Sequence, residues 1–291
     1  MNVTKGRVWG LSPAVAFKYG SVMRIGVLGL MDTSHLVPHA PEGVELVIYP
    51  PRIGAFPHTP YDRLLVDLAH VDAAERAAAD GVDALLIDST CDWGIEAIRA
   101  AVDIPVVGAG EVGITEASEG GRRFGIVTIW PPALEFLYTE RARTVPGGEN
   151  CTGIRYASGD HELARLGEDE SVIARMDRRE EPVLDRIVEE CRRSVEEDGA
   201  EAILLGCTCM AKTAPLIEER FQDVPVIEAA RLALKAALVA APAHRNRSGL
   251  TGVVPALVDT WVAGAPSPRL PDADECNVCA EIALSEQLDR V

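Results

Sequence analysis

Residues 202–209, Ala-Ile-Leu-Leu-Gly-Cys-Thr-Cys, nearly repeat residues 84–91, Ala-Leu-Leu-Ile-Asp-Ser-Thr-Cys. Each stretch is an apolar run that ends in small polar and thiol residues. This pattern is typical of a buried parallel strand whose carboxyl end reaches an active-site crevice. The two copies differ most where Ser89 takes the place of Cys207. The stretches therefore predict two related α/β units with different reactive residues.

The segments that follow these two stretches also match. Helix-like residues 93–101 lead into Asp-Ile-Pro-Val-Val at 103–107, and residues 211–220 lead into Asp-Val-Pro-Val-Ile at 223–227. The simplest explanation is a duplication. We expect an α/β protein of two similar lobes, each a parallel sheet flanked by helices. Pseudo-two-fold symmetry would relate the lobes and place the active site between them.

Hydrophobic patterning indicates where the elements of each lobe lie. Strands are expected near residues 24–30, 44–49, 84–88 and 105–107, and again near 124–129, 153–157, 202–206 and 225–227. Helices are expected near 61–79, 93–101 and 111–119, and again near 131–142, 170–197, 211–220 and 228–240, with Glu228 as the cap of the last one. We divide the chain into an N-terminal extension (1–23), a first lobe (24–120), a second lobe (121–241) and a C-terminal extension (242–291). This division allows the last helix, near residues 228–240, to pack against the first lobe.

Composition is that of a globular enzyme, with 47% hydrophobic and 25% charged residues. A formal net charge of -17 without clusters of Lys and Arg argues against nucleic-acid binding. No stretch has the length and apolarity of a membrane span or a clear secretory signal. The seven cysteines lack regular spacing. We therefore expect a cytoplasmic protein whose thiols stay free for chemistry.

Two similar reactive residues on opposite faces of a small substrate suit proton transfer at carbon, in which one face loses a proton and the other gains one. Cysteine is suited to this task, because a helix N-terminus can lower the pKa of a thiol and each reactive turn leads into a helix. The spacing therefore predicts Cys207 as an acid or base on one face of the substrate.

Five segments resemble the aspartate/glutamate/hydantoin racemase superfamily, and most closely its hydantoin racemase group. They are residues 87–99, 105–108, 124–128, 197–210 and 225–228, of which Leu-Gly-Cys-Thr around Cys207 is the most specific. The resemblance implies two lobes with a cysteine from each and no cofactor. It also implies a substrate whose acidic carbon lies beside a carbonyl or carboxylate.

The chain departs from the family pattern at Ser89, where relatives carry the first-lobe cysteine. A hydroxyl is a much weaker acid than a thiol and seldom acts as a base without activation. Several explanations stay open: Cys91 replaces the missing thiol, Asp88 or Asp92 activates Ser89, the reaction needs only one thiol, or Ser89 replaces a natural cysteine.

Polar residues after several of the predicted strands are candidates for substrate binding, because hydroxyls and exposed amides suit a carboxylate or an imide. Their alternative role is turn formation and helix capping. The candidates are Asp32, Thr33, Ser34 and Thr128. Thr90 and Thr208 flank the reactive positions and are candidates to offer backbone donors to an enolate-like oxygen.

We expect no metal and no cofactor. The close pair His35 and His39 has Pro38 between them, which spoils a helical metal-binding face. Cys276 and Cys279 have zinc-like spacing but no second ligand pair.

The leading hypothesis is a cofactor-independent racemase or epimerase of the hydantoin or amino-acid type. Cys207 would act on one face of the substrate, and Ser89 or Cys91 on the other. The alternatives are a one-thiol relative, such as an arylmalonate-type decarboxylase or a maleate-type cis-trans isomerase, and an inactive binding protein. The expected partners are a small molecule with a carboxylate, imide or ureide group and further copies of the chain. Trp93 and Trp130 could accommodate a ring or an apolar substituent.

Overall fold

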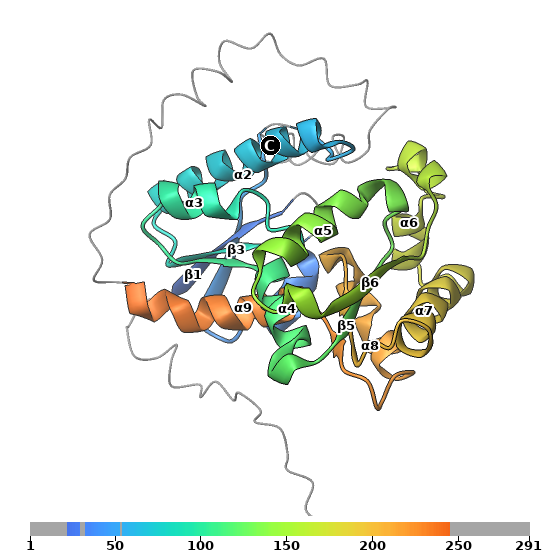
Figure 1. Cartoon of the computed structure of the whole chain (residues 1–291). Helices are drawn as coiled ribbons and strands as arrows, with labels where there is room; N and C mark the ends of the chain where they lie inside the picture. Colours follow the sequence, from blue (N-terminus) through green and yellow to red (C-terminus); the bar gives the residue numbers. More distant parts are fainter. Residues whose placement is uncertain (1–21, 30–32, 53, 245–291) are drawn as a thin grey trace, which may run out of the picture.

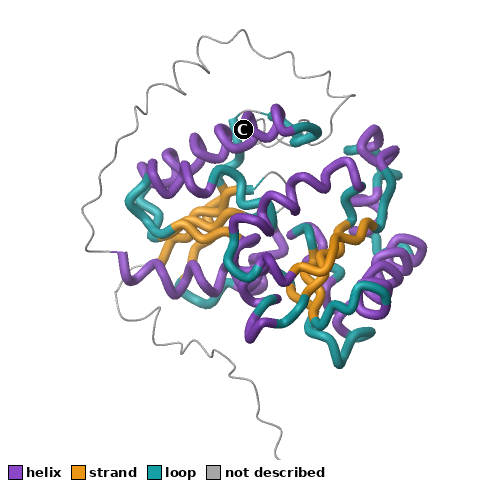
Figure 2. Tube along the Cα trace, in the orientation of Figure 1, coloured by secondary structure: helices purple, strands orange, loops and turns teal. Residues whose placement is uncertain are grey.

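The computed structural model describes residues 22–29, 33–52 and 54–244. The C-terminal extension and most of the N-terminal extension predicted from the sequence lie outside the described residues (Figure 1). Within the described part, the chain forms two α/β lobes, each with its own sheet (Figure 2).

The first sheet contains β1 (Met23–Leu28), β2 (Val44–Ile48), β3 (Ala84–Ile87) and β4 (Val106–Gly108). The strands are all parallel and lie in the order β2-β1-β3-β4. Every residue of β3 is buried, as its continuous apolar run predicts for a central strand covered on both faces.

The second sheet contains β5 (Phe124–Thr128), β6 (Cys151–Tyr156), β7 (Ala202–Leu205) and β8 (Val226–Ile227). It is also parallel, in the order β6-β5-β7-β8. Each strand has a counterpart at the same place in the first sheet, with β3 matching β7. The two-lobed parallel α/β fold predicted from the internal repeat is confirmed.

Helices cover both faces of the sheets, as parallel strands require. They are α2 (Pro60–Ala79), α3 (Ile95–Ala101), α4 (Ala109–Ala117), α5 (Glu135–Thr144), α6 (Val172–Asp177), α7 (Glu181–Glu196), α8 (Ala214–Glu218) and α9 (Ala229–Ala240). Figure 1 shows α2 and α3 on one side of the first sheet and α9, in orange, on the other. Helix α9 packs on β3, β4 and α4, so the last helix returns to the first lobe. No helix in the described ranges combines the length and apolarity needed to cross a membrane.

The largest difference from the sequence prediction lies in residues 170–197, which were expected to form one helix. The structure has two helices there, α6 and α7. Arg179 adopts a left-handed conformation with φ 58°, which ends the first helix, and Pro182 lies in the first turn of the second, where proline is tolerated. The predicted helices 131–142 and 211–220 differ less, because each begins with a 3-10 turn, Pro132–Leu134 and Thr208–Lys212 respectively.

The predicted cap at Glu228 is confirmed. Its side chain accepts hydrogen bonds from the backbone N–H groups of Ala230 and Arg231 at the start of α9. Such a cap satisfies two of the donors that the first turn of a helix leaves unpaired.

Candidate active site

The turns that follow β3 and β7 have the same local structure. In the first lobe, the Cys91 N–H donates to Ser89 Oγ over 3.2 Å. In the second, the Cys209 N–H donates to Cys207 Sγ over 3.3 Å. The structure therefore makes Ser89 the counterpart of Cys207 and Cys91 the counterpart of Cys209, as the sequence repeat predicts.

Two reciprocal hydrogen bonds join these turns across the lobes. The Thr90 hydroxyl donates to the Gly206 carbonyl oxygen over 2.6 Å, and the Thr208 hydroxyl donates to the Asp88 carbonyl oxygen over 3.1 Å. Each threonine thus reaches the residue just before the reactive position of the other lobe, as a pseudo-two-fold axis between the turns requires. Both hydroxyls therefore hold the turns together, which leaves open the predicted role of the backbone donors near Thr90 and Thr208.

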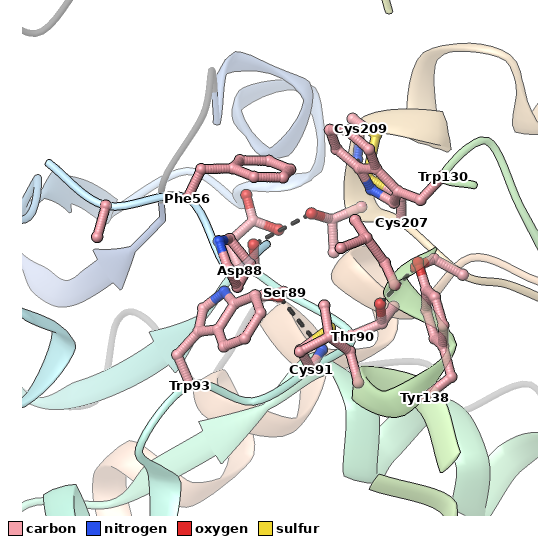
Figure 3. A pocket seen from close by; sticks show the side chains of 16 residues that line it. Phe56, Asp88, Ser89, Thr90, Cys91, Trp93, Trp130, Tyr138, Cys207 and Cys209 are labelled. Atoms are coloured by element: carbon pink, nitrogen blue, oxygen red, sulfur yellow. Dashed lines mark hydrogen bonds between the residues drawn. A yellow bond between two sulfur atoms is a disulfide. The ribbon is translucent and has the colours of Figure 1, made fainter. Parts of the chain in front are cut away.

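A pocket lies where the two turns meet (Figure 3). Aromatic and aliphatic side chains form most of its wall, and the Phe56 and Trp130 rings lie 5.3 Å apart between centroids. No Lys, Arg or His belongs to the described residues that line it. The lining residues are Ala55, Phe56, Pro57, Asp88, Ser89, Thr90, Cys91, Trp93, Trp130, Leu134, Leu137, Tyr138, Gly206, Cys207, Thr208 and Cys209.

The structure corrects the expectation that all the thiols are free, because Cys207 and Cys209 form a disulfide. The turn brings their Cα atoms to 5.2 Å, within the range that a disulfide can bridge. In this state Cys207 has no thiol, so acid or base chemistry at its sulfur requires the reduced pair. The free cysteines of the described residues are Cys91, Cys151 and Cys191.

Cys91, an alternative base in the sequence analysis, lines the pocket but is buried. Burial raises the pKa of its thiol to about 12, against a smaller opposing effect of Arg63. A thiol with this pKa supplies almost no thiolate near neutral pH. The environment therefore does not favour Cys91 as a base.

The Asp92 carboxylate binds other groups, so it does not activate Ser89. Its carboxylate accepts the N–H groups of Gly110 and Glu111, each over 2.7 Å, and lies 2.8 Å from Arg141 Nε of the other lobe. The Arg141 N–H is not aligned for a hydrogen bond, so this contact is ionic. Burial raises the pKa of Asp92 to about 7, against the opposing effects of Arg141 and the backbone donors. Asp92 is an anchor for the segment after the Ser89 turn.

Gly108 and Gly110 leave room for this anchor. A Cβ atom at Gly108 would overlap the Asp92 carboxylate, and one at Gly110 would overlap the Thr90 carbonyl oxygen. Both positions therefore need glycine so that α4 can approach the turn closely.

Asp88, the second residue proposed to activate Ser89, has a buried carboxylate that lines the pocket. Its Oδ2 lies 3.3 Å from Nε2 of His35, and the two side chains are only 2% and 5% exposed. The sequence analysis treated His35 only as an unsuitable metal ligand. A signal was available, since the repeat places an acid at position 88 where the second lobe has Gly206.

The remaining binding candidates do not line the pocket in the described part of the chain. Thr33 is buried and precedes a 3-10 helix, Ser34–His39, whose first residue is exposed. Thr128 is fully buried, where its hydroxyl contacts the Tyr138 hydroxyl over 2.7 Å and accepts the Trp130 N–H. Asp32 lies outside the described residues.

No group of three or more His, Cys, Asp or Glu side chains suitable for a metal occurs among the residues that the structure describes. Cys276 and Cys279 lie outside those residues.

Fold and site together define a class of two-lobed α/β protein, in which equivalent turns of the two lobes face one pocket. Comparison with known proteins identifies the family. The model of the Asp/Glu/hydantoin racemase family matches residues 33–237, and the chain belongs to this family. It is accordingly an isomerase of the racemase class.

Curated relatives include a hydantoin racemase from Pseudomonas sp. (strain NS671), 30% identical over 185 residues that cover 63% of this chain and 69% of the relative. Another is a hydantoin racemase from Paenarthrobacter aurescens, 27% identical over 225 residues that cover 74% of this chain and 89% of the relative. Solved structures with the same fold include allantoin racemase from Klebsiella pneumoniae, with a TM-score of 0.61, 22% identity and coverage of 74% and 86% of the two chains. Allantoin racemase from Pseudomonas fluorescens has a TM-score of 0.63, 23% identity and coverage of 74% and 89%.

Proposed function

We propose that this protein racemises hydantoins that carry one apolar substituent at C5, with no cofactor. Cys207, in its reduced form, acts as acid or base on one face of C5, and Ser89 faces the other side. The observation that carries the proposal is the pocket between their turns, which is apolar and has no cationic side chain among its described lining residues.

The lack of a cationic side chain among the described lining residues bears on the choice of substrate. A free amino acid or a dicarboxylate brings at least one carboxylate, and burying this charge is costly unless a cation or several donors compensate it. Asp88, an acidic residue, lines the same pocket and would repel such a substrate. A hydantoin ring is neutral and carries amide groups, so it avoids this cost.

The wall of the pocket bears on the C5 substituent. Phe56, Trp93 and Trp130 present rings, and Leu134 and Leu137 add aliphatic surface. Burial of apolar area is favourable by about 25 cal/mol per Å², so this wall favours a benzyl or alkyl group over the polar ureido group of allantoin. The relatives named hydantoin racemase support the ring assignment.

Proton transfer at C5 needs a base and a means of stabilising the enolate oxygen. A backbone N–H already points at Cys207 Sγ, and such a donor favours the anionic form of a reduced sulfur. We propose that backbone N–H groups of the two turns, around Thr90 and Thr208, stabilise the enolate. Ser89 delivers or accepts the proton on the opposite face.

The test is exchange of the C5 proton for deuterium in D₂O with each enantiomer of 5-benzylhydantoin, in the presence of dithiothreitol. NMR follows the exchange and chiral chromatography follows racemisation. We expect activity on both enantiomers, little on allantoin, and none on aspartate or glutamate. The variant Cys207→Ala should lose exchange, whereas Cys151→Ala, which removes a cysteine on β6 outside the pocket, should keep it. Full exchange by Cys207→Ala would refute the assignment of the base.

One observation favours a second candidate function. Of the two equivalent positions, Cys207 carries a thiol when reduced, whereas Ser89 carries a hydroxyl, which is a much weaker acid. This favours a reaction on one face of the substrate alone, such as a decarboxylation that ends in protonation by Cys207. Deuterium exchange separates the two, because one-face chemistry labels a single enantiomer of 5-benzylhydantoin and forms none of the other. Release of carbon dioxide from a disubstituted malonate detects the decarboxylation.

A further inference from the structure

Among the described residues, a side chain contacts the Asp88 carboxylate at one of its two oxygens. His35 lies against Oδ2, and the Thr208 hydroxyl fixes the backbone of the residue by donating to its carbonyl oxygen. The other carboxylate oxygen, Oδ1, is buried and has no hydrogen-bond partner among the described residues. Figure 3 shows this side chain below the Phe56 ring, next to Ser89.

A buried acceptor without a donor is unfavourable, and more so when it belongs to an acidic group. Native structures keep such a group where a ligand or an ordered water satisfies it. Since Asp88 lines the pocket beside Ser89, a substrate in this pocket is well placed to supply the missing donor.

A hydantoin has two N–H groups that could donate to Asp88 Oδ1, and their places in the ring distinguish them. The reacting carbon, C5, must lie between Ser89 and Cys207 if the proposed function is right. In a hydantoin, N1 is bonded directly to C5, whereas N3 lies across the ring between the two carbonyl groups. Asp88 is the residue next to Ser89 and lines the same pocket, and N1–H is the ring donor next to C5.

We propose that Asp88 is a specificity-determining residue that accepts the N1–H of the substrate through Oδ1. The proposal rests on the proposed function and deepens it by naming the substrate class as cyclic ureides that carry N–H beside the reacting carbon. Rings with an oxygen at this position present a lone pair to the carboxylate and are rejected.

The test compares 5-benzylhydantoin with 5-benzyl-oxazolidine-2,4-dione, in which a ring oxygen replaces N1–H without added bulk. C5 exchange in D₂O is measured for both at a pH below the pKa of the oxazolidinedione N3–H, so that both rings are neutral. Each rate is divided by its own uncatalysed exchange rate because the two carbons differ in acidity. We expect the wild type to prefer the hydantoin by about 100-fold in kcat/KM, since a buried polar group selects strongly against an analogue that leaves it unpaired.

The variant Asp88→Asn has nearly the same shape and offers an amide N–H that can donate to the ring oxygen. It should reduce the preference to about 10-fold or less, chiefly by gaining activity on the oxazolidinedione. Asp103→Asn, which removes a carboxylate of the first lobe away from the pocket, should keep the preference of the wild type. The preference is a ratio within one enzyme preparation, so a partly unfolded variant still reports it.

The outcomes separate the two proposals. If the reduced wild type exchanges C5 of neither ring, the hydantoin assignment fails, and the role of Asp88 with it. If the wild type exchanges both rings equally well, or if Asp88→Asn retains the full preference, the role of Asp88 is overturned while the proposed function stands. N1-methyl- and N3-methyl-5-benzylhydantoin check the chosen nitrogen, and a penalty at N3 that depends on Asp88 also overturns the assignment.

Discussion

Replacing Arg141 by methionine should destabilise the folded protein most at alkaline pH. Methionine keeps much of the apolar stem of the side chain but removes the guanidinium that lies 2.8 Å from the Asp92 carboxylate. The carboxylate is fully buried and keeps only the N–H donors of Gly110 and Glu111. Removing one partner of a buried ion pair costs about 3 to 5 kcal/mol when the remaining charge cannot escape.

Protonation of Asp92 removes the unpaired charge, so the pKa of Asp92 sets the pH dependence of the stability loss. Burial raises the pKa in the folded protein to about 7 from an ordinary value of 3.8. The folded state therefore holds this proton more tightly than the unfolded chain does. The resulting stabilisation is complete below about pH 4 and is lost as the pH rises through about 7. Without Arg141 the pKa rises further, so the loss in the variant continues above pH 7.

The difference in the free energy of unfolding between wild type and Arg141→Met should thus grow above pH 7. The growth is at most about 1.4 kcal/mol per pH unit, towards a limit of about 3 to 5 kcal/mol. Urea unfolding followed by tryptophan fluorescence at about pH 5, 7 and 8.5 measures it. The control Arg165→Met removes an exposed partner of Glu168 and should change stability by less than about 1 kcal/mol at each pH. An equal loss at pH 5 and 8.5 would refute the reasoning.

Three further predictions concern the turns. Air-oxidised wild type should regain activity with dithiothreitol, whereas Cys209→Ser, which cannot form the bond to Cys207, should be active without it; chiral chromatography measures both. Gly110→Ala should destabilise the protein by about 2 kcal/mol or more, because its Cβ would overlap the Thr90 carbonyl oxygen, and thermal melting should show a lower Tm. Cys91→Ala should leave the shape of the pH–kcat/KM profile unchanged between about pH 6 and 9, since burial raises the pKa of that thiol to about 12. A lost or shifted limb of the profile would mean that Cys91 titrates during catalysis.

The architecture was predictable because the decisive signals are local. The apolar runs of β3 and β7 are buried throughout, and each ends at a turn with the same side chain-to-backbone hydrogen bond. Two copies of one local pattern were enough to predict the lobes and the pocket between them. The cap formed by Glu228 was also predictable from local sequence, because its hydrogen-bond donors are the backbone N–H groups of Ala230 and Arg231.

Features that depend on distant partners were not predictable in the same way. Asp92 was considered as an activator of Ser89, but its carboxylate instead pairs with Arg141 on another lobe. The sequence predicts backbone donors near Thr90 and Thr208, but it gives no sign that their hydroxyls reach across to the opposite turn. A sequence shows which side chains can donate, but the packing of the lobes decides what they meet. The break between α6 and α7 had a visible signal in Pro182, which the amphipathic pattern around it obscured.

The inequality of Ser89 and Cys207 has a kinetic consequence that separates two-face from one-face chemistry. Two enantiomers with a single stereocentre have equal free energies in solution. The values of kcat/KM in the two directions of a racemisation must therefore be equal, however different the two reacting groups are. A hydroxyl and a thiol bind and transfer protons differently, so kcat and KM can each differ between the enantiomers while their ratio stays the same. If Ser89 takes part, both enantiomers of 5-benzylhydantoin should show equal kcat/KM with unequal kcat. If only Cys207 acts, one enantiomer should exchange its C5 proton with retention and the other should not react.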